Sequence, residues 1–266
     1  MSTTRVLSGL ALIPIMFVVV WFLPPAYFAG LAVAAGVIGQ GELYTMAKAR
    51  GIEPLRIVGV VLGSLLIINV YTPLYPYLGG PAFWITLSVL AVLTARLFSR
   101  RPVEGALEDI AVTLLGIFYV AMLFGFQVAI HAGQGKKWLV FLYLVIWAAD
   151  TGAYYAGTTW GRHRLYEKIS PKKSIEGLVG GTLASVVAAA LCKIWLVPAI
   201  GWAEAVLVGA LLALVGTVGD LVESLIKRSA GVKDSGTLIP GHGGILDRMD
   251  SMLFAAPVLF YYLRMR

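Results

Sequence analysis

Charged residues are concentrated in one stretch of an otherwise apolar chain, from Gly219 to Ser251. This stretch holds five acidic residues, four basic residues and a histidine. Asp220 and Lys227 stand seven positions apart, so on a helix they share one face. Asp247 and Asp250 stand three apart and can share a face of the following helix. Carboxylates gathered in this way need water, a cation or basic partners.

A glycine-rich turn separates the two acidic segments. Its members are Gly236, Pro240, Gly241, Gly243 and Gly244. They interrupt any regular helix and leave backbone N–H groups exposed. Carboxylates suit a divalent cation, and lysines and arginines suit phosphate. We therefore expect phosphate chemistry on a metal ion.

Two blocks of residues point to a family. The first runs Ser224-Leu-Ile-Lys227-Arg228, then Lys233-Asp234, then Pro240-Gly-His242-Gly243-Gly244, then Asp247-Arg248-Met-Asp250. The second consists of Asp150, Ala153-Tyr154, Gly157, Gly161 and Ser170-Pro-Lys-Lys-Ser-Ile-Glu-Gly177. Together they resemble the phosphatidate cytidylyltransferases, the CDP-diacylglycerol synthases, over the C-terminal half of the chain. Many members have threonine where this chain has Ser174, a change that keeps the hydroxyl.

The resemblance implies the reaction of CTP with phosphatidate to give CDP-diacylglycerol and pyrophosphate. It implies Asp220 and Asp247 as the principal metal ligands, Asp250 as a further carboxylate, and Lys227 as a catalytic phosphate contact. It also implies magnesium, a second cation and a homodimer. The residues expected at the substrates are Lys172, Lys173, Ser174, Ser224, Arg228, Lys233, Asp234, His242, Gly243, Gly244 and Arg248. His242 could act in the site or hold the turn, and Arg248 could contact phosphate or pair with Asp234.

The composition predicts a polytopic membrane protein. The 266 residues are 59% hydrophobic and only 13% charged, whereas soluble domains carry about 25% charged residues. The mean hydropathy is +0.85. The single cysteine, Cys192, excludes a disulfide framework within one chain. We interpret the net charge of +7 as loops beside anionic lipid rather than a nucleic-acid surface.

Apolar length predicts an all-α bundle of about nine transmembrane helices. The expected spans are 6–23, 26–47, 57–76, 81–98, 110–130, 138–158, 177–199, 202–226 and 251–263. We treat residues 1–266 as one membrane domain, with N-terminal helices in 1–137 and a catalytic half in 138–266. The first span is long for a signal peptide and ends in no small-x-small cleavage site, so we expect it to be retained.

The basic residues predict the orientation. With the N-terminus in the cytoplasm, basic residues within 48–56, 96–101, 162–173 and 227–248 all fall on the cytoplasmic side. The opposite side receives only Lys136, Lys137, Arg264 and Arg266. We therefore expect a cell-membrane enzyme with both polar blocks facing the cytoplasm.

Isolated polar residues receive simpler interpretations. Asp150 needs a partner, a metal or a water-filled cavity near the membrane, and a structural salt bridge would serve equally well. Ser170 or Ser174 could cap a helix in the 170–177 loop, whose lysines could bind phosphate or only lipid headgroups. We interpret Glu42 as a carboxylate at the membrane surface. His131 and His163 are expected on the surface.

Three other functions are compatible with parts of the sequence. A transporter would also have charged residues at the ends of its spans, but the unusual residues occur in the C-terminal half only. A lipid-alcohol phosphotransferase would carry a D-G-x-x-A-R run, which the chain lacks. A relative acting on an isoprenoid ether lipid phosphate could keep the same polar blocks.

Overall fold

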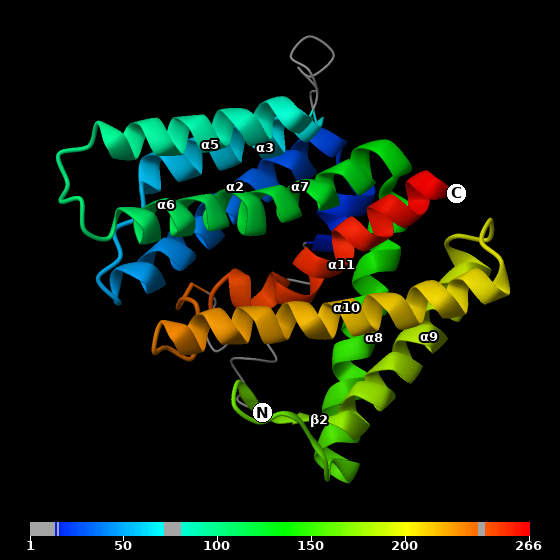
Figure 1. The fold of residues 1–266 in the computed structure, drawn as a ribbon. Helices are drawn as coiled ribbons and strands as arrows, with labels where there is room; N and C mark the ends of the chain where they lie inside the picture. Colours follow the sequence, from blue (N-terminus) through cyan, green and yellow to red (C-terminus); the bar gives the residue numbers. More distant parts are fainter. Residues whose placement is uncertain (1–13, 15, 72–80, 239–242) are drawn as a thin grey trace. The chain divides into compact units, whose positions relative to one another are not determined.

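The computed structural model describes residues 14, 16–71, 81–238 and 243–266. Within them the chain is almost entirely helical (Figure 1), which confirms the predicted all-α membrane fold. The helices are α2 (Pro25–Lys48), α3 (Arg56–Tyr71), α5 (Pro81–Leu97), α6 (Ala106–Leu115), α7 (Met122–Ala129), α8 (Lys136–Trp160), α9 (Ile175–Trp195), α10 (Trp202–Ser229) and α11 (Leu246–Met265). Two π-helical segments, η1 (Gly116–Ala121) and η2 (Ile130–Gln134), flank α7.

The described helices lie where apolar length predicts them, and the predicted span 6–23 lies partly outside the described residues. Five helical segments are long and apolar enough to cross a membrane: α2, Ala106–Gln134, α8, α9 and α10. The remaining described helices are either shorter than a bilayer requires or, like α11, begin with several charges. A two-stranded antiparallel hairpin, β1 (Arg164–Tyr166) with β2 (Ser170–Ser174), joins α8 to α9.

The chain divides into two compact units. One comprises residues 1–132 and 230–248, and the other comprises 133–229 and 249–266. The segment 230–248 therefore belongs with the N-terminal helices, although it follows α10 in the sequence. We call these the first and second units.

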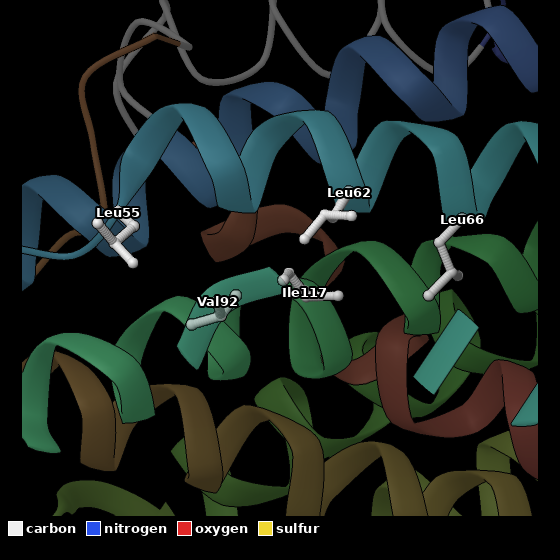
Figure 2. Close-up of a cluster of buried hydrophobic side chains, with 5 residues drawn as sticks. All are labelled: Leu55, Leu62, Leu66, Val92 and Ile117. Atoms are coloured by element: carbon white, nitrogen blue, oxygen red, sulfur yellow. The ribbon is translucent and has the colours of Figure 1, made fainter. Parts of the chain in front are cut away.

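The first unit is built around apolar contacts between α3, α5 and η1. Figure 2 shows Leu62 and Leu66 of α3 with Val92 of α5 and Ile117 of η1, next to Leu55. These five side chains are buried. Close packing of this kind fixes the helices relative to one another, because many van der Waals contacts that are individually weak add up.

The second unit depends on close approach of α8 and α9, which run side by side (Figure 1). A Cβ added at Gly152 of α8 would lie 2.5 Å from the Cβ of Ala184, and one at Gly181 of α9 would lie 2.7 Å from the carbonyl oxygen of Ala149. Gly157 likewise faces the Cα of Gly177. The absence of a side chain at Gly152 and Gly157 thus permits the close approach of α8 and α9.

The expectation for His131 is wrong, whereas that for His163 is confirmed. His131 is buried, its Nε2 lies 2.9 Å from the carbonyl oxygen of Val20, and its ring packs on Phe28. The short polar run after it suggested a surface loop, but the residue continues the helix through η2 and faces α2. His163 is exposed and its Nδ1 lies 2.6 Å from Glu176.

Candidate functional site

Asp220 joins the two polar blocks of the sequence within the second unit. It lies on α10, and its Oδ2 forms an ion pair of 2.5 Å with Nζ of Lys173 on β2. Its Oδ1 accepts a hydrogen bond of 3.3 Å from Ser224 Oγ, one helical turn along. Both partners of the ion pair keep part of their surface exposed, 25% for Lys173 and 31% for Asp220. The pair is therefore accessible to a ligand.

Asp250 is the second carboxylate of this group. It lies in the first turns of α11, ahead of the apolar run expected to enter the membrane, and α10 approaches it closely at Gly219, where an added Cβ would lie 2.6 Å from the Asp250 carbonyl oxygen. Removal from water and the nearby charge of Asp220 raise the pKa of Asp250 to about 6. Two carboxylates that repel each other in this way would be stabilised by a shared cation.

Lys227 is held in a buried ion pair. Its Nζ lies 3.2 Å from Oε1 of Glu223, four residues earlier on α10, and the Glu223 side chain is 0% exposed. Such a pair is costly to break on one side only, because the remaining charge stays buried. Arg228, the next residue, is exposed. Arg228 is thus the more accessible of the two for a phosphate.

The start of α9 presents the second polar block. Ser174 is its N-cap and accepts a hydrogen bond of 3.0 Å from Gly177 N, as predicted for a capping serine. Glu176 accepts backbone hydrogen bonds from Arg162 and His163, which closes the base of the hairpin. Lys172 is exposed on the hairpin. The hairpin therefore sets Lys172 and Lys173 at a defined place beside α10.

The remaining predicted residues of the described chain lie in the first unit. Asp247 Oδ2 accepts hydrogen bonds from Ser235 N (2.7 Å), Ser235 Oγ (2.8 Å) and Gly244 N (2.9 Å). Gly243 has a φ of 82°, a conformation that favours glycine. Lys233, Asp234 and Arg248 are exposed. His242, Pro240 and Gly241 lie outside the described residues.

Glu42 is the residue that the sequence interpretation missed. Its carboxylate accepts hydrogen bonds from Ser235 Oγ, Ile245 N and Leu246 N, contacts that the interpretation as a membrane-surface carboxylate does not include. No spacing rule links it to these partners, which lie about two hundred positions away in the sequence. Only its unusual place near the end of an apolar helix could have drawn attention to it.

The donor set is compatible with a magnesium ion. Among residues 14, 16–71, 81–238 and 243–266, no group of three or more His, Cys, Asp or Glu side chains is arranged to hold a metal. Asp220 and Asp250 nevertheless form a mutually repelling pair in the second unit, and magnesium commonly binds one or two carboxylates with phosphate oxygens and water completing its shell. The set of Asp220, Asp247 and Asp250 stays a prediction.

Comparison with known proteins identifies the family to which the chain belongs. The cytidylyltransferase family matches residues 3–266. A phosphatidate cytidylyltransferase of Synechocystis sp. is 33% identical over 98% of this chain and 96% of its own length, and one of Bacillus subtilis is 32% identical over 97% and 96%. One of Staphylococcus saprophyticus is 42% identical over 57% of this chain and 58% of its own length. The chain belongs to the cytidylyltransferase family.

Proposed function

We propose that this protein is a phosphatidate cytidylyltransferase, which converts CTP and phosphatidate to CDP-diacylglycerol and pyrophosphate. The observation that carries the proposal is its similarity, over nearly full length, to two proteins of that name. The paired carboxylates Asp220 and Asp250 beside Lys173 suit this chemistry, because the reaction joins two polyanions.

The reaction needs charge neutralisation more than acid–base catalysis. A phosphate oxygen of phosphatidate bonds to the α-phosphorus of CTP, and the bond from that phosphorus to the bridging oxygen of the β-phosphate breaks to release pyrophosphate. Phosphatidate is already ionised near neutral pH, so no general base is required. Two unit charges 4 Å apart repel by about 4 kcal/mol at an effective dielectric of 20, and several such pairs must approach.

The basic residues and the carboxylates would share this task. Asp220 and Asp250 would hold a magnesium ion, with Asp247 as a further ligand, and the bound ion would neutralise and align the phosphates. Lys173, which pairs with Asp220, would be free to donate to a phosphate oxygen if Asp220 held the cation. Lys172, Arg228, Lys233 and Arg248 are exposed and can bind further phosphate oxygens.

The placement of the substrates follows from the charge asymmetry of the loops. We propose that the protein lies in the cell membrane with its polar segments in the cytoplasm. CTP would arrive from the cytoplasm, while the lipid would enter laterally from the bilayer. The homodimer and the second cation implied by the resemblance stay predictions.

The test uses the full chain purified in detergent with CTP, phosphatidate and magnesium. We expect CDP-diacylglycerol and pyrophosphate to form in equal amounts, and EDTA to abolish both. Asp220→Asn and Asp247→Asn should each lower the rate by about a hundred-fold or more, because each would remove a metal ligand. The matched control is Glu204→Gln, at the other end of α10, where the carboxylate accepts a hydrogen bond from Gly201 N.

The outcomes separate the function from the site. Absence of product with any lipid phosphate would overturn the proposal. Product from an isoprenoid ether lipid phosphate alone would replace phosphatidate as the substrate. Full activity of both aspartate variants would keep the reaction and reject the proposed metal ligands.

A further inference from the structure

We propose that Glu42 is a positioning residue for the reaction. In this role it holds Ser235, Ile245 and Leu246 in place and thereby the carboxylate of Asp247. The inference rests on the proposed function for its catalytic part and on the contacts within the first unit for its structural part. It also assigns a task to the N-terminal helices, for which the sequence suggests no chemistry.

The Glu42 carboxylate binds the start of α11 with both oxygens. Oε1 accepts a hydrogen bond of 2.9 Å from Ile245 N. Oε2 accepts one of 3.0 Å from Leu246 N and one of 2.9 Å from Ser235 Oγ. The first N–H groups of a helix have no partner within the helix. A carboxylate at that end satisfies these donors and also interacts favourably with the helix dipole.

Ser235 links Glu42 to Asp247. Its hydroxyl lies 2.9 Å from Glu42 Oε2 and 2.8 Å from Asp247 Oδ2. A hydroxyl has one hydrogen to donate, so it serves one ionised carboxylate at a time. Asp247 retains the amides of Ser235 and Gly244 as further donors. If Asp247 turns toward a cation, the Ser235 hydroxyl can stay on Glu42 and keep the segment in place.

Gly236 and Gly244 leave the space that the Glu42 carboxylate occupies. A Cβ added at Gly236 would lie 2.8 Å from Glu42 Oε1, and one at Gly244 would overlap both Glu42 carboxylate oxygens and Ser235 Oγ. A side chain at either position would clash with Glu42. Such close approach is expected of a built contact rather than of a side chain resting on a surface.

Glu42 itself stands on a helix that is held firmly on both sides. Two residues before it, Gln40 Nε2 donates to the carbonyl oxygen of Gly59 at 2.9 Å. Two residues after it, Tyr44 OH donates to the carbonyl oxygen of Thr113 at 3.0 Å. Both side chains are buried. Because α2 is held in this way, Glu42 offers a fixed point of attachment for the residues next to Asp247.

The test compares Glu42→Gln and Glu42→Ala with a matched control, Asp109→Asn. Asp109 is a buried carboxylate of the same unit, and it accepts hydrogen bonds from Arg96 Nε and Glu53 N. Backbone amide exchange by mass spectrometry reports residues 235–238 and 243–246 without needing activity. Steady-state kinetics with CTP and phosphatidate report the reaction.

We expect faster exchange at 235–238 and 243–246 in both Glu42 variants, by about ten-fold in Glu42→Gln and more in Glu42→Ala, since charged hydrogen-bond acceptors are lost. We expect kcat to fall by up to about a hundred-fold, with KM for CTP within about two-fold, because a small displacement of a reacting group lowers the rate steeply. Glu42→Gln should retain more activity than Glu42→Ala. Asp109→Asn should lower the melting temperature but alter neither the exchange rate of these residues nor kcat.

Unchanged exchange at 235–238 and 243–246 in the Glu42 variants would overturn the anchoring role. Faster exchange with unchanged kcat would overturn the positioning role. If the wild-type protein forms no CDP-diacylglycerol, the proposed function fails, and the exchange measurement alone decides whether Glu42 anchors the segment.

Discussion

Individual carboxylates in the candidate site differ in how their charge is balanced. Asp220 has an ion pair with Lys173 and Glu223 has one with Lys227. Asp247 is surrounded by donors of the segment around Ser235. Asp250 has less compensation, and its pKa is raised to about 6 by removal from water and by Asp220. It is therefore the carboxylate whose protonation should respond to pH in the range where an enzyme is assayed.

This leads to a prediction on magnesium binding. A raised pKa means that Asp250 is increasingly protonated as the pH falls through about 6, and a protonated carboxyl is a poor ligand. Affinity for magnesium should thus be full above that pH and fall by up to about ten-fold per unit below it. The measurement is thermal stabilisation by magnesium without CTP, from about pH 5 to about pH 8.

The control for the pH prediction is Asp250→Asn. This variant should bind magnesium more weakly and lose the part of the pH dependence that lies near pH 6. Omission of CTP matters, because its phosphates titrate in the same range. An identical pH profile in wild type and variant would reject Asp250 as the titrating ligand.

For single residues, the sequence predicts contacts between neighbours three or four positions apart and misses contacts between distant segments. The Ser174 cap and the face shared by Asp220 and Ser224 follow from neighbours three or four positions apart. The roles of Glu42 and Ser235 depend on contacts between distant segments. The pairing of Lys173 with Asp220 needs α10 to meet β2, which no periodicity reveals.

The packing of α8, α9 and α10 holds Lys173 and Asp220 at the distance observed between them. In the second unit, α9 packs against α8 through glycines and against α10 through Ser185, whose Oγ donates to the carbonyl oxygen of Gly209 at 2.6 Å. Small residues allow backbones to approach, which is how helices gain contact where lipid removes the hydrophobic driving force. The same three helices carry Lys173 and Asp220 at their polar ends or at the adjoining hairpin, so their packing sets that ion pair.

We predict that Gly181→Ala destabilises the protein. An added Cβ would lie 2.7 Å from the carbonyl oxygen of Ala149 and 3.0 Å from the Cβ of Ala153, both on α8, so the helices must move apart. Overpacking of this kind costs about 1–3 kcal/mol. The measurement is the melting temperature in detergent. Activity should fall along with it, because Lys173 and Asp220 would separate.

The matched control for Gly181→Ala is Gly30→Ala. Gly30 lies in α2 with nothing within 4 Å of an added Cβ. Alanine favours a helix by about 1 kcal/mol relative to glycine, so this variant should be unchanged or slightly more stable. Equal melting temperatures for the two variants would mean that the α8–α9 contact is looser than the structure indicates.

The extents of the helices were largely predictable because apolar length is a property of the local sequence. The predicted span 202–226 corresponds to α10 (Trp202–Ser229), and 138–158 corresponds to α8 (Lys136–Trp160). For the hairpin of β1 and β2 the sequence predicts only a loop, since most of its residues are polar and neither strand exceeds five residues. The inclusion of 230–248 in the first unit is not predictable, because it rests on contacts between distant segments, such as that of Glu42 with Ile245.

On the scale of the whole molecule, the ends of α8 decide the orientation. This helix has 25 residues, which at 1.5 Å per residue gives about 37 Å, enough to cross a hydrocarbon core of about 30 Å. Lys137 lies at its start and Lys168 in the hairpin just beyond its end, and both are exposed. If α8 spans the membrane, these two positions must face opposite sides.

We predict that Lys168 faces the cytoplasm and Lys137 the outside, because basic residues concentrate on the hairpin side. Lys137→Cys and Lys168→Cys, each in a Cys192→Ser background that removes the only native thiol, are labelled with a membrane-impermeant maleimide. In intact cells Lys137→Cys should react, and Lys168→Cys should react only after permeabilisation. The reverse pattern would place Lys172 and Lys173 on the side without CTP and contradict the proposed reaction. Labelling of both in intact cells would mean that α8 does not span the membrane.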